Sequence, residues 1–205
     1  MIKHIFFCKK ILDNINIKII VFFISLFYIS NAFSKSGPGV EGGIGYADIG
    51  AEETAQTIAN LSGSTTLVTY DRATWYGRLF YEYEFNRETF LDIGYFMTGS
   101  LDATYTLSGA SATEGYTMNG LEASMGIKND GVFFKGGFHQ SEVNGKASIT
   151  IGGTTYAAAA SATGPGFLFG AGIEDDQFRY GITYYDSVGG MDDANVWVGY
   201  YGIKF

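Results

Sequence analysis

The amino-acid sequence predicts an all-β fold, and three observations support this prediction. The 205 residues include 29 glycines, 15 tyrosines and 17 phenylalanines but only 2 prolines, a mixture that is rich in strand and turn residues and poor in helix formers. Segments of about ten residues recur in which apolar and polar side chains alternate. Very short turns and long stretches of small polar residues separate these segments in alternation.

The amino terminus is predicted to be an export signal. Lysines precede an apolar run from Ile19 to Ile29, and small residues follow it, which is the pattern of a secretory signal peptide. We expect a signal peptide over 1–34, cleaved after Ala32 or Ser34, and one domain over 35–205. The alternative, a membrane anchor, requires about 20 apolar residues, roughly twice the length of this run.

Removal of this segment changes the charge and the cysteine content. Residues 1–34 contain four lysines and one aspartate, so the formal net charge would move from −8 to −11. Cys8 is the sole cysteine and would leave with the signal. Because phosphate contacts need clustered lysine and arginine, an acidic chain of this kind argues against a nucleic-acid partner.

Eight strands are predicted from the alternation. In the clearest segment, 75–85, one parity is apolar and aromatic, and the opposite parity carries Arg78, Glu82 and Glu84. The same scheme recurs along the chain. The predicted strands are near 39–48, 75–85, 91–97, 120–128, 132–139, 166–174, 178–184 and 195–205.

The connections between these strands alternate in length. Three short turns are predicted at 86–88, 129–131 and 175–177, and four long loops at 49–73, 99–115, 141–163 and 186–194. In a membrane barrel, short turns face the periplasm and long loops face outward. This asymmetry would place both termini in the periplasm.

The apolar face of these strands predicts a membrane environment. Four or five large apolar groups per strand exceed the few hundred Å² that a soluble surface tolerates, whereas strands of about 9–11 residues suffice to cross a bilayer. Glycines on the opposite face suit a narrow eight-stranded interior. The fold class is therefore an eight-stranded antiparallel transmembrane β-barrel, with Trp75, Tyr95, Trp197 and Tyr201 as candidates for its interfacial aromatic belts. A soluble β-sandwich is the alternative, with mixed loop lengths and an enclosed aromatic core.

The end of the chain carries a family resemblance. The pattern Tyr201-x-Ile203-x-Phe205 resembles the terminal signature by which the barrel-assembly machinery recognises outer-membrane proteins. With the segments 81–86 and 170–174, it makes residues 38–205 similar to the OmpA-like and OmpX-like eight-stranded barrels, including the opacity-type surface proteins. The resemblance implies a bacterial outer-membrane location among its lipids and lipopolysaccharide, with an extracellular ligand for the loops as one option.

Charged residues of inward parity form the candidate site. The predicted lumenal network contains six residues: Arg78, Glu82, Glu122, Lys135, Glu174 and Arg179. We expect Glu82 near mid-depth and Glu41 nearer the periplasmic end, with Lys204. Buried charges need partners, and the family resemblance suggests that such a network plugs the barrel. An open solute path would need a wider lumen than eight strands usually give.

One polar pair suggests an enzyme. His139 and Ser141 resemble the catalytic pair of the PagL-type lipid A deacylases, which are also eight-stranded barrels. A triad needs an acidic group that orients the base, and Glu142 has the opposite parity. We therefore predict no catalytic residues.

No metal or cofactor is expected either. Asp186, Asp192 and Asp193 cluster in the last predicted loop, but their spacing matches no defined calcium loop. The sequence predicts a non-enzymatic outer-membrane barrel with a structural or adhesion-like surface role. A lipid A deacylase-like hydrolase and a small diffusion channel are the alternatives.

Overall fold

A computed structural model describes residues 36–48, 67–107, 110–175 and 177–205. The predicted signal peptide and most of the first predicted loop lie outside these ranges. The strands are β1 (Gly37–Asp48), β2 (Leu67–Tyr70), β3 (Ala73–Glu84), β4 (Thr89–Thr98), β5 (Leu101–Leu107), β6 (Ala110–Asn129), β7 (Val132–Ile151), β8 (Thr154–Glu174), β9 (Phe178–Tyr185) and β10 (Asn195–Lys204), and a short 3-10 helix, η2, covers Val188–Gly190. None of the helical structure in these ranges is long and apolar enough to cross a lipid bilayer.

Eight strands close into a ring. Its order is β1, β3, β4, β6, β7, β8, β9 and β10, all neighbours are antiparallel, and β10 pairs back with β1. The two ends of the chain therefore meet, with Tyr201 opposite Gly42 and the Phe205 N–H donating to the Pro38 carbonyl over 2.9 Å. The predicted eight-stranded antiparallel barrel is confirmed.

Side chains alternate between the lumen and the outer surface. Along β3, exposed residues such as Trp75 and Leu79 alternate with buried ones such as Arg78 and Glu82. Successive side chains of a strand point to opposite faces, so the two parities of the sequence become the two surfaces of the wall. The outer one is apolar and the inner one holds the charges.

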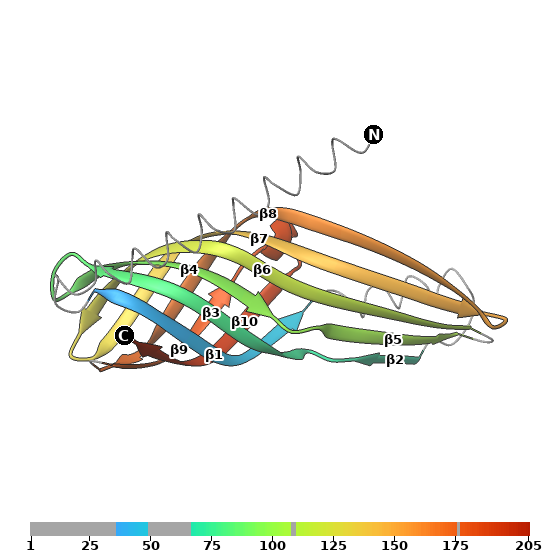
Figure 1. Cartoon of the computed structure of the whole chain (residues 1–205), viewed down its shortest axis with the longest axis horizontal. Helices are drawn as coiled ribbons and strands as arrows, with labels where there is room; N and C mark the ends of the chain where they lie inside the picture. Colours follow the sequence, from blue (N-terminus) through green and yellow to red (C-terminus); the bar gives the residue numbers. More distant parts are fainter. Residues whose placement is uncertain (1–35, 49–66, 108–109, 176) are drawn as a thin grey trace, which may run out of the picture.

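Local chemistry explains the short turns. The Asn86 side-chain oxygen accepts from the Glu88 and Thr89 amides over 2.8 and 2.9 Å, and Asp175 does the same for two amides after it. Asp130 and Gly131 both have positive φ, 48° and 81°, as a type I′ hairpin turn requires. All three turns lie at the same end of the barrel as the carboxyl terminus (Figure 1).

Two predicted loops are wrong, and a third, 49–73, contains the short strand β2 in its described part. Most of the range 99–115 lies in β5 and the start of β6, and 141–163 lies in β7 and β8 apart from the turn between them. That turn is Gly152-Gly153, with positive φ at both residues, which is a two-residue hairpin geometry.

The five strands β2, β5, β6, β7 and β8 form a sheet that extends well beyond the ring (Figure 1). We call it the extension, and it comprises β2, β5 and residues 110–119, 140–151 and 154–165. The remaining long connection, 186–194, stays outside the strands as predicted and includes η2.

Candidate functional site: the charged lumen and the barrel mouth

Arg179 lies at the centre of the lumenal charges. Its guanidinium is 0% exposed and contacts carboxylates from several strands: Nη1 is 3.0 Å from Asp92 Oδ2, Nε donates to Glu174 over 2.8 Å, and Nη2 contacts Glu82. The aromatic ring of Phe133 lies under the same guanidinium, 4.7 Å from its carbon. One cation therefore links β9 to β3, β4 and β8 across the lumen.

Arg78 forms the second centre. Its Nη1 donates to Glu41 Oε1 over 3.0 Å, and its Nη2 contacts Asp92 and lies 2.6 Å from Glu122 Oε1. Lys135 Nζ completes this level at 3.6 Å from Asp92. Since both arginines share Asp92, the two centres form one network.

At the turn end, two lysines balance three carboxylates. Glu82, Glu84 and Glu174 bring one oxygen each within 4.8 Å of one another. Lys128 Nζ lies among them at 2.5, 2.9 and 2.6 Å, and Lys204 Nζ is 2.6 Å from Glu174. Ammonium groups thus occupy the position where a cation would bind. A cavity of about 770 Å³ opens from this level to the short turns.

The structure brings together all six residues of the predicted network. Glu41 and Lys204, which the sequence also predicts to face inward, belong to the same network, and so do Glu84, Asp92 and Lys128. Asp92 and Lys128 share the inward parity of their strands, which is the signal that identifies them. The expected depths of two residues are wrong, because Glu41 lies beside Arg78 and Glu82 beside the turn-end lysines. In the described residues the network contains six carboxylates and five cations, so it is close to neutral.

Two tyrosines lie next to the ion pairs, on the side of the extension. Tyr185 donates to Glu122 Oε2 over 2.7 Å, and its hydroxyl is 2.8 Å from that of Tyr76. The Phe96 ring packs on Tyr185 at a centroid distance of 4.7 Å. The lumen therefore changes from charged to aromatic at this level.

His139 and Ser141 hold the last loop, 186–194, by hydrogen bonds, and we call this pair the latch. Both are buried. The Gly189 N–H donates to Ser141 Oγ over 2.8 Å, Ser141 Oγ is 3.1 Å from His139 Nδ1, and His139 Nε2 is 2.8 Å from the Asp186 carbonyl. A neutral histidine protonated at Nε2 satisfies the whole chain of bonds. The pair thus holds residues 186–189 against the inner side of β7.

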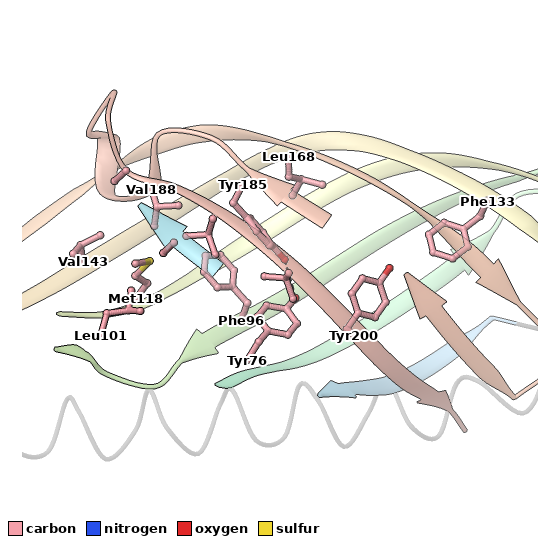
Figure 2. Close-up of a cluster of buried hydrophobic side chains, with 14 of the residues drawn as sticks. Tyr76, Phe96, Leu101, Met118, Phe133, Val143, Leu168, Tyr185, Val188 and Tyr200 are labelled. Carbon is pink, nitrogen blue, oxygen red and sulfur yellow. Dashed lines mark hydrogen bonds between the residues drawn. The ribbon is translucent and has the colours of Figure 1, made fainter. Parts of the chain in front are cut away.

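An apolar cluster covers this latch at the mouth of the barrel. Val188 is fully buried and lies with Leu101, Met118 and Val143 in the same core (Figure 2). These side chains come from η2, β5, β6 and β7, so the inward-folded loop packs against the base of the extension. The lumen is closed by ion pairs in the half nearer the short turns and by apolar side chains at the end from which the extension rises.

The last strand presents the terminal pattern on the outer surface. Tyr201 and Phe205 are exposed, and Ile203 lies opposite Val40 of β1. The three residues therefore line the outer side of the seam at which the ring closes.

Solved structures similar to this chain include Ail and OprG. Ail, the attachment invasion locus protein of Yersinia pestis, in complex with the heparin analogue sucrose octasulfate, has a TM-score of 0.52 at 15% identity, over 83% of this chain and 99% of that chain. The outer membrane protein OprG from Pseudomonas aeruginosa has a TM-score of 0.43 at 13% identity, over 84% and 97% of the two chains. Neither a protein-family model nor a curated protein matches the sequence. The likeness to Ail shows a shared fold.

Proposed function

We propose that this chain is an integral protein of the bacterial outer membrane, with a sealed lumen and a structural or surface-interaction role carried by its extension. The observation that carries the proposal is the outer surface of the ring. Large apolar side chains are 40–69% exposed on every strand of the ring, among them Ile44, Leu121, Phe138, Phe169 and Ile182. Such a surface far exceeds the apolar patches of soluble proteins.

The backbone of the ring suits the same environment. Every neighbouring pair of strands is hydrogen-bonded, including β1 with β10, so the ring has no open edge. Backbone groups in a bilayer must be satisfied within the protein, and a closed barrel does this. The outer-membrane location rests on this closure together with the apolar surface.

The two ends of the barrel support an orientation. The short turns and Phe205 lie at one end, and the extension rises from the other (Figure 1). Barrels of this class keep short turns in the periplasm and long segments outside. We infer that the extension stands on the cell surface and that the carboxyl terminus lies in the periplasm.

The closed lumen argues against transport. A solute would have to pass the Arg78 and Arg179 ion pairs and then the apolar cluster around Val188. Breaking a buried ion pair costs about 3–5 kcal/mol, so an open path through the network would carry a large free-energy cost. The diffusion channel is therefore the weaker alternative.

A hydrolase is also less well supported than the structural or surface-interaction role. The Ser141 hydroxyl is buried inside the barrel and already bonded to His139 and Gly189, and His139 bonds a backbone carbonyl where a triad would place a carboxylate. We assign an adhesion-like role to the extension instead, because it is the part of the described chain that lies beyond the apolar outer surface of the ring. Ail is named for attachment and invasion. The fold similarity to Ail does not carry the adhesion-like role proposed for this chain, which is inferred from the extension.

Membrane insertion can be tested by fractionation and gel mobility. The protein should be in the outer-membrane fraction and should migrate differently in detergent gels with and without boiling. Recovery from a soluble periplasmic extract would contradict the proposal.

Two further measurements test the alternatives. Planar bilayers containing the protein should show no discrete conductance steps, whereas steps would favour the channel. Cells that express Ser141→Ala should have the same lipid A as cells that express the original chain, and a difference would favour the hydrolase.

A further inference from the structure

The outer face of the extension contains a groove of about 890 Å³, whose lining combines small apolar surface with hydroxyl, amide and charged groups. Small residues in its lining include Gly115, Ala157 and Ala159. The polar side chains of the lining come from β5, β6 and β7, chiefly Asp102, Thr104, Thr113, Asn144, Lys146 and Ser148. The groove lies apart from the charged lumen.

Cross-strand register arranges these side chains in rows. Thr113 of β6 lies opposite both Thr104 and Ser148, and its hydroxyl is 2.9 Å from that of Ser148. In the next row, Gly115 lies between Asp102 and Lys146. Asp102 Oδ1 leans over the glycine, so close that an added Cβ would be 2.8 Å from it. A side chain at Gly115 would therefore displace the Asp102 carboxylate from its place in the groove.

The groove stands directly above the lipid-facing surface. The outward parity of β6 runs from the exposed Leu121 through Thr117 and Gly115 to Thr113. At about 3.3 Å per residue and a tilt of about 45°, the groove begins roughly 10 Å above Leu121 and ends roughly 20 Å above it. It opens sideways, so in a membrane it faces the head groups of neighbouring lipids.

We propose that this groove binds uncharged sugar units of glycolipids in the same outer leaflet; the inference rests on the proposed function, which inserts the ring in that membrane. Hydroxyl and amide groups both donate and accept hydrogen bonds, as sugar hydroxyls require. The charged residues of the lining are Asp102, Glu114 and Lys146. The Glu114 carboxylate accepts from the Tyr105 and Tyr116 hydroxyls, and one lysine beside two carboxylates offers no positive patch to a sulfated or phosphorylated ligand.

Other occupants fit this groove less well. It has no tryptophan, tyrosine or arginine among its lining residues, and these residues anchor most protein partners. Hydrogen bonds alone would give weak binding to a sugar, but lipids that surround the barrel are present at high effective concentration. A weak site therefore suffices for a ligand that is already in the leaflet.

The test uses the full barrel in nanodiscs with two lipids of the same acyl chains, one bearing uncharged hexose units on its head group and one truncated so that it lacks them. Amide resonances of Thr113, Gly115 and Asn144 should shift with the sugar-bearing lipid and not with the truncated one. Gly115→Phe, which fills the groove, should reduce these shifts at least tenfold at Asn144. Thr155→Val is the matched control, because its hydroxyl forms a similar 2.9 Å pair with Thr150 beyond the groove and should leave the shifts unchanged.

Three results would overturn the inference: equal shifts with both lipids, an unchanged response in Gly115→Phe, or saturation by the free uncharged oligosaccharide in nanodiscs without glycolipid. The last result would assign the groove to a soluble saccharide. Each sample is first checked for heat-modifiable migration. A barrel that does not insert contradicts the proposed function, whereas an inserted barrel without these shifts contradicts the sugar site alone.

Discussion

Arg179 Nη1 lies 3.0 Å from Asp92 Oδ2, although the two residues are 87 positions apart in the chain. They come from β9 and β4, on separate parts of the ring, and both side chains are buried. The contact therefore requires closure of the whole barrel. It also joins the Arg179 and Arg78 centres through one carboxylate.

Replacing Arg179 with methionine should destabilise the barrel strongly. The substitution leaves buried carboxylates without their cation, which costs about 3–5 kcal/mol. The free energy of unfolding, measured by urea titration in lipid vesicles, reports the loss. Arg87→Met in an exposed turn is the control and should change stability by less than about 0.5 kcal/mol; similar small losses in both variants would refute the network's role in stability.

Replacing Ser141 with alanine should release the last loop. The Gly189 N–H would lose its buried acceptor, at a cost of about 1–3 kcal/mol, so its hydrogen exchange should accelerate roughly tenfold to a hundredfold. Ser124→Ala removes another buried hydroxyl of the lumen and should leave Gly189 exchange unchanged. If the Gly189 amide exchanges equally fast in the original chain, Ser141→Ala and Ser124→Ala, then Ser141 does not hold the loop.

Two glycines of the wall should respond oppositely to alanine. A Cβ at Gly137 would collide with the backbone of Ala123 and Ser124, whereas one at Gly199 would meet nothing within 4 Å. We expect Gly137→Ala to cost about 1–3 kcal/mol or more, and Gly199→Ala to be neutral or to stabilise by about 0.5–1 kcal/mol. Thermal unfolding followed by gel mobility measures both, and equal tolerance would contradict the narrow lumen.

Tyr105 in the extension should titrate at unusually high pH. Burial, followed by the nearby Glu114 carboxylate, raises the pKa of its phenol to about 12. A phenol whose pKa is raised by folding stabilises the fold below its unfolded value near 10, and this contribution is lost as the pH rises towards 12. Site-specific ¹³C labelling of Tyr105 should show a midpoint near 12. A midpoint near 10 would mean that the ring is not enclosed by the extension.

The ring was predictable from sequence because one parity of each strand is apolar. In β3, four apolar side chains point outward and three charged side chains point inward. This contrast identifies both the strand and its two faces. In the extension, threonine, alanine and serine occupy both parities, so the contrast disappears beyond Asn119 and Gln140. Only the Gly152-Gly153 pair indicates a hairpin there.

The site was predictable in membership but not in pairing. Parity identifies inward charges, whereas the partners depend on the stagger between strands. Glu41 lies opposite Arg78 and Glu82 opposite Asp92, which no single segment of sequence specifies. The role of His139 and Ser141 depends on a loop that lies 47 residues further along the chain, so a catalytic pair and a latch look alike in the sequence.

The most direct test of the account is tryptophan fluorescence. The chain has two tryptophans, Trp75 and Trp197, which are 56% and 55% exposed on the outer surface of the ring. In vesicles, lipids brominated on their acyl chains should quench both, and aqueous iodide should quench neither. Strong quenching by iodide with no effect of brominated lipid would contradict a ring embedded in the membrane.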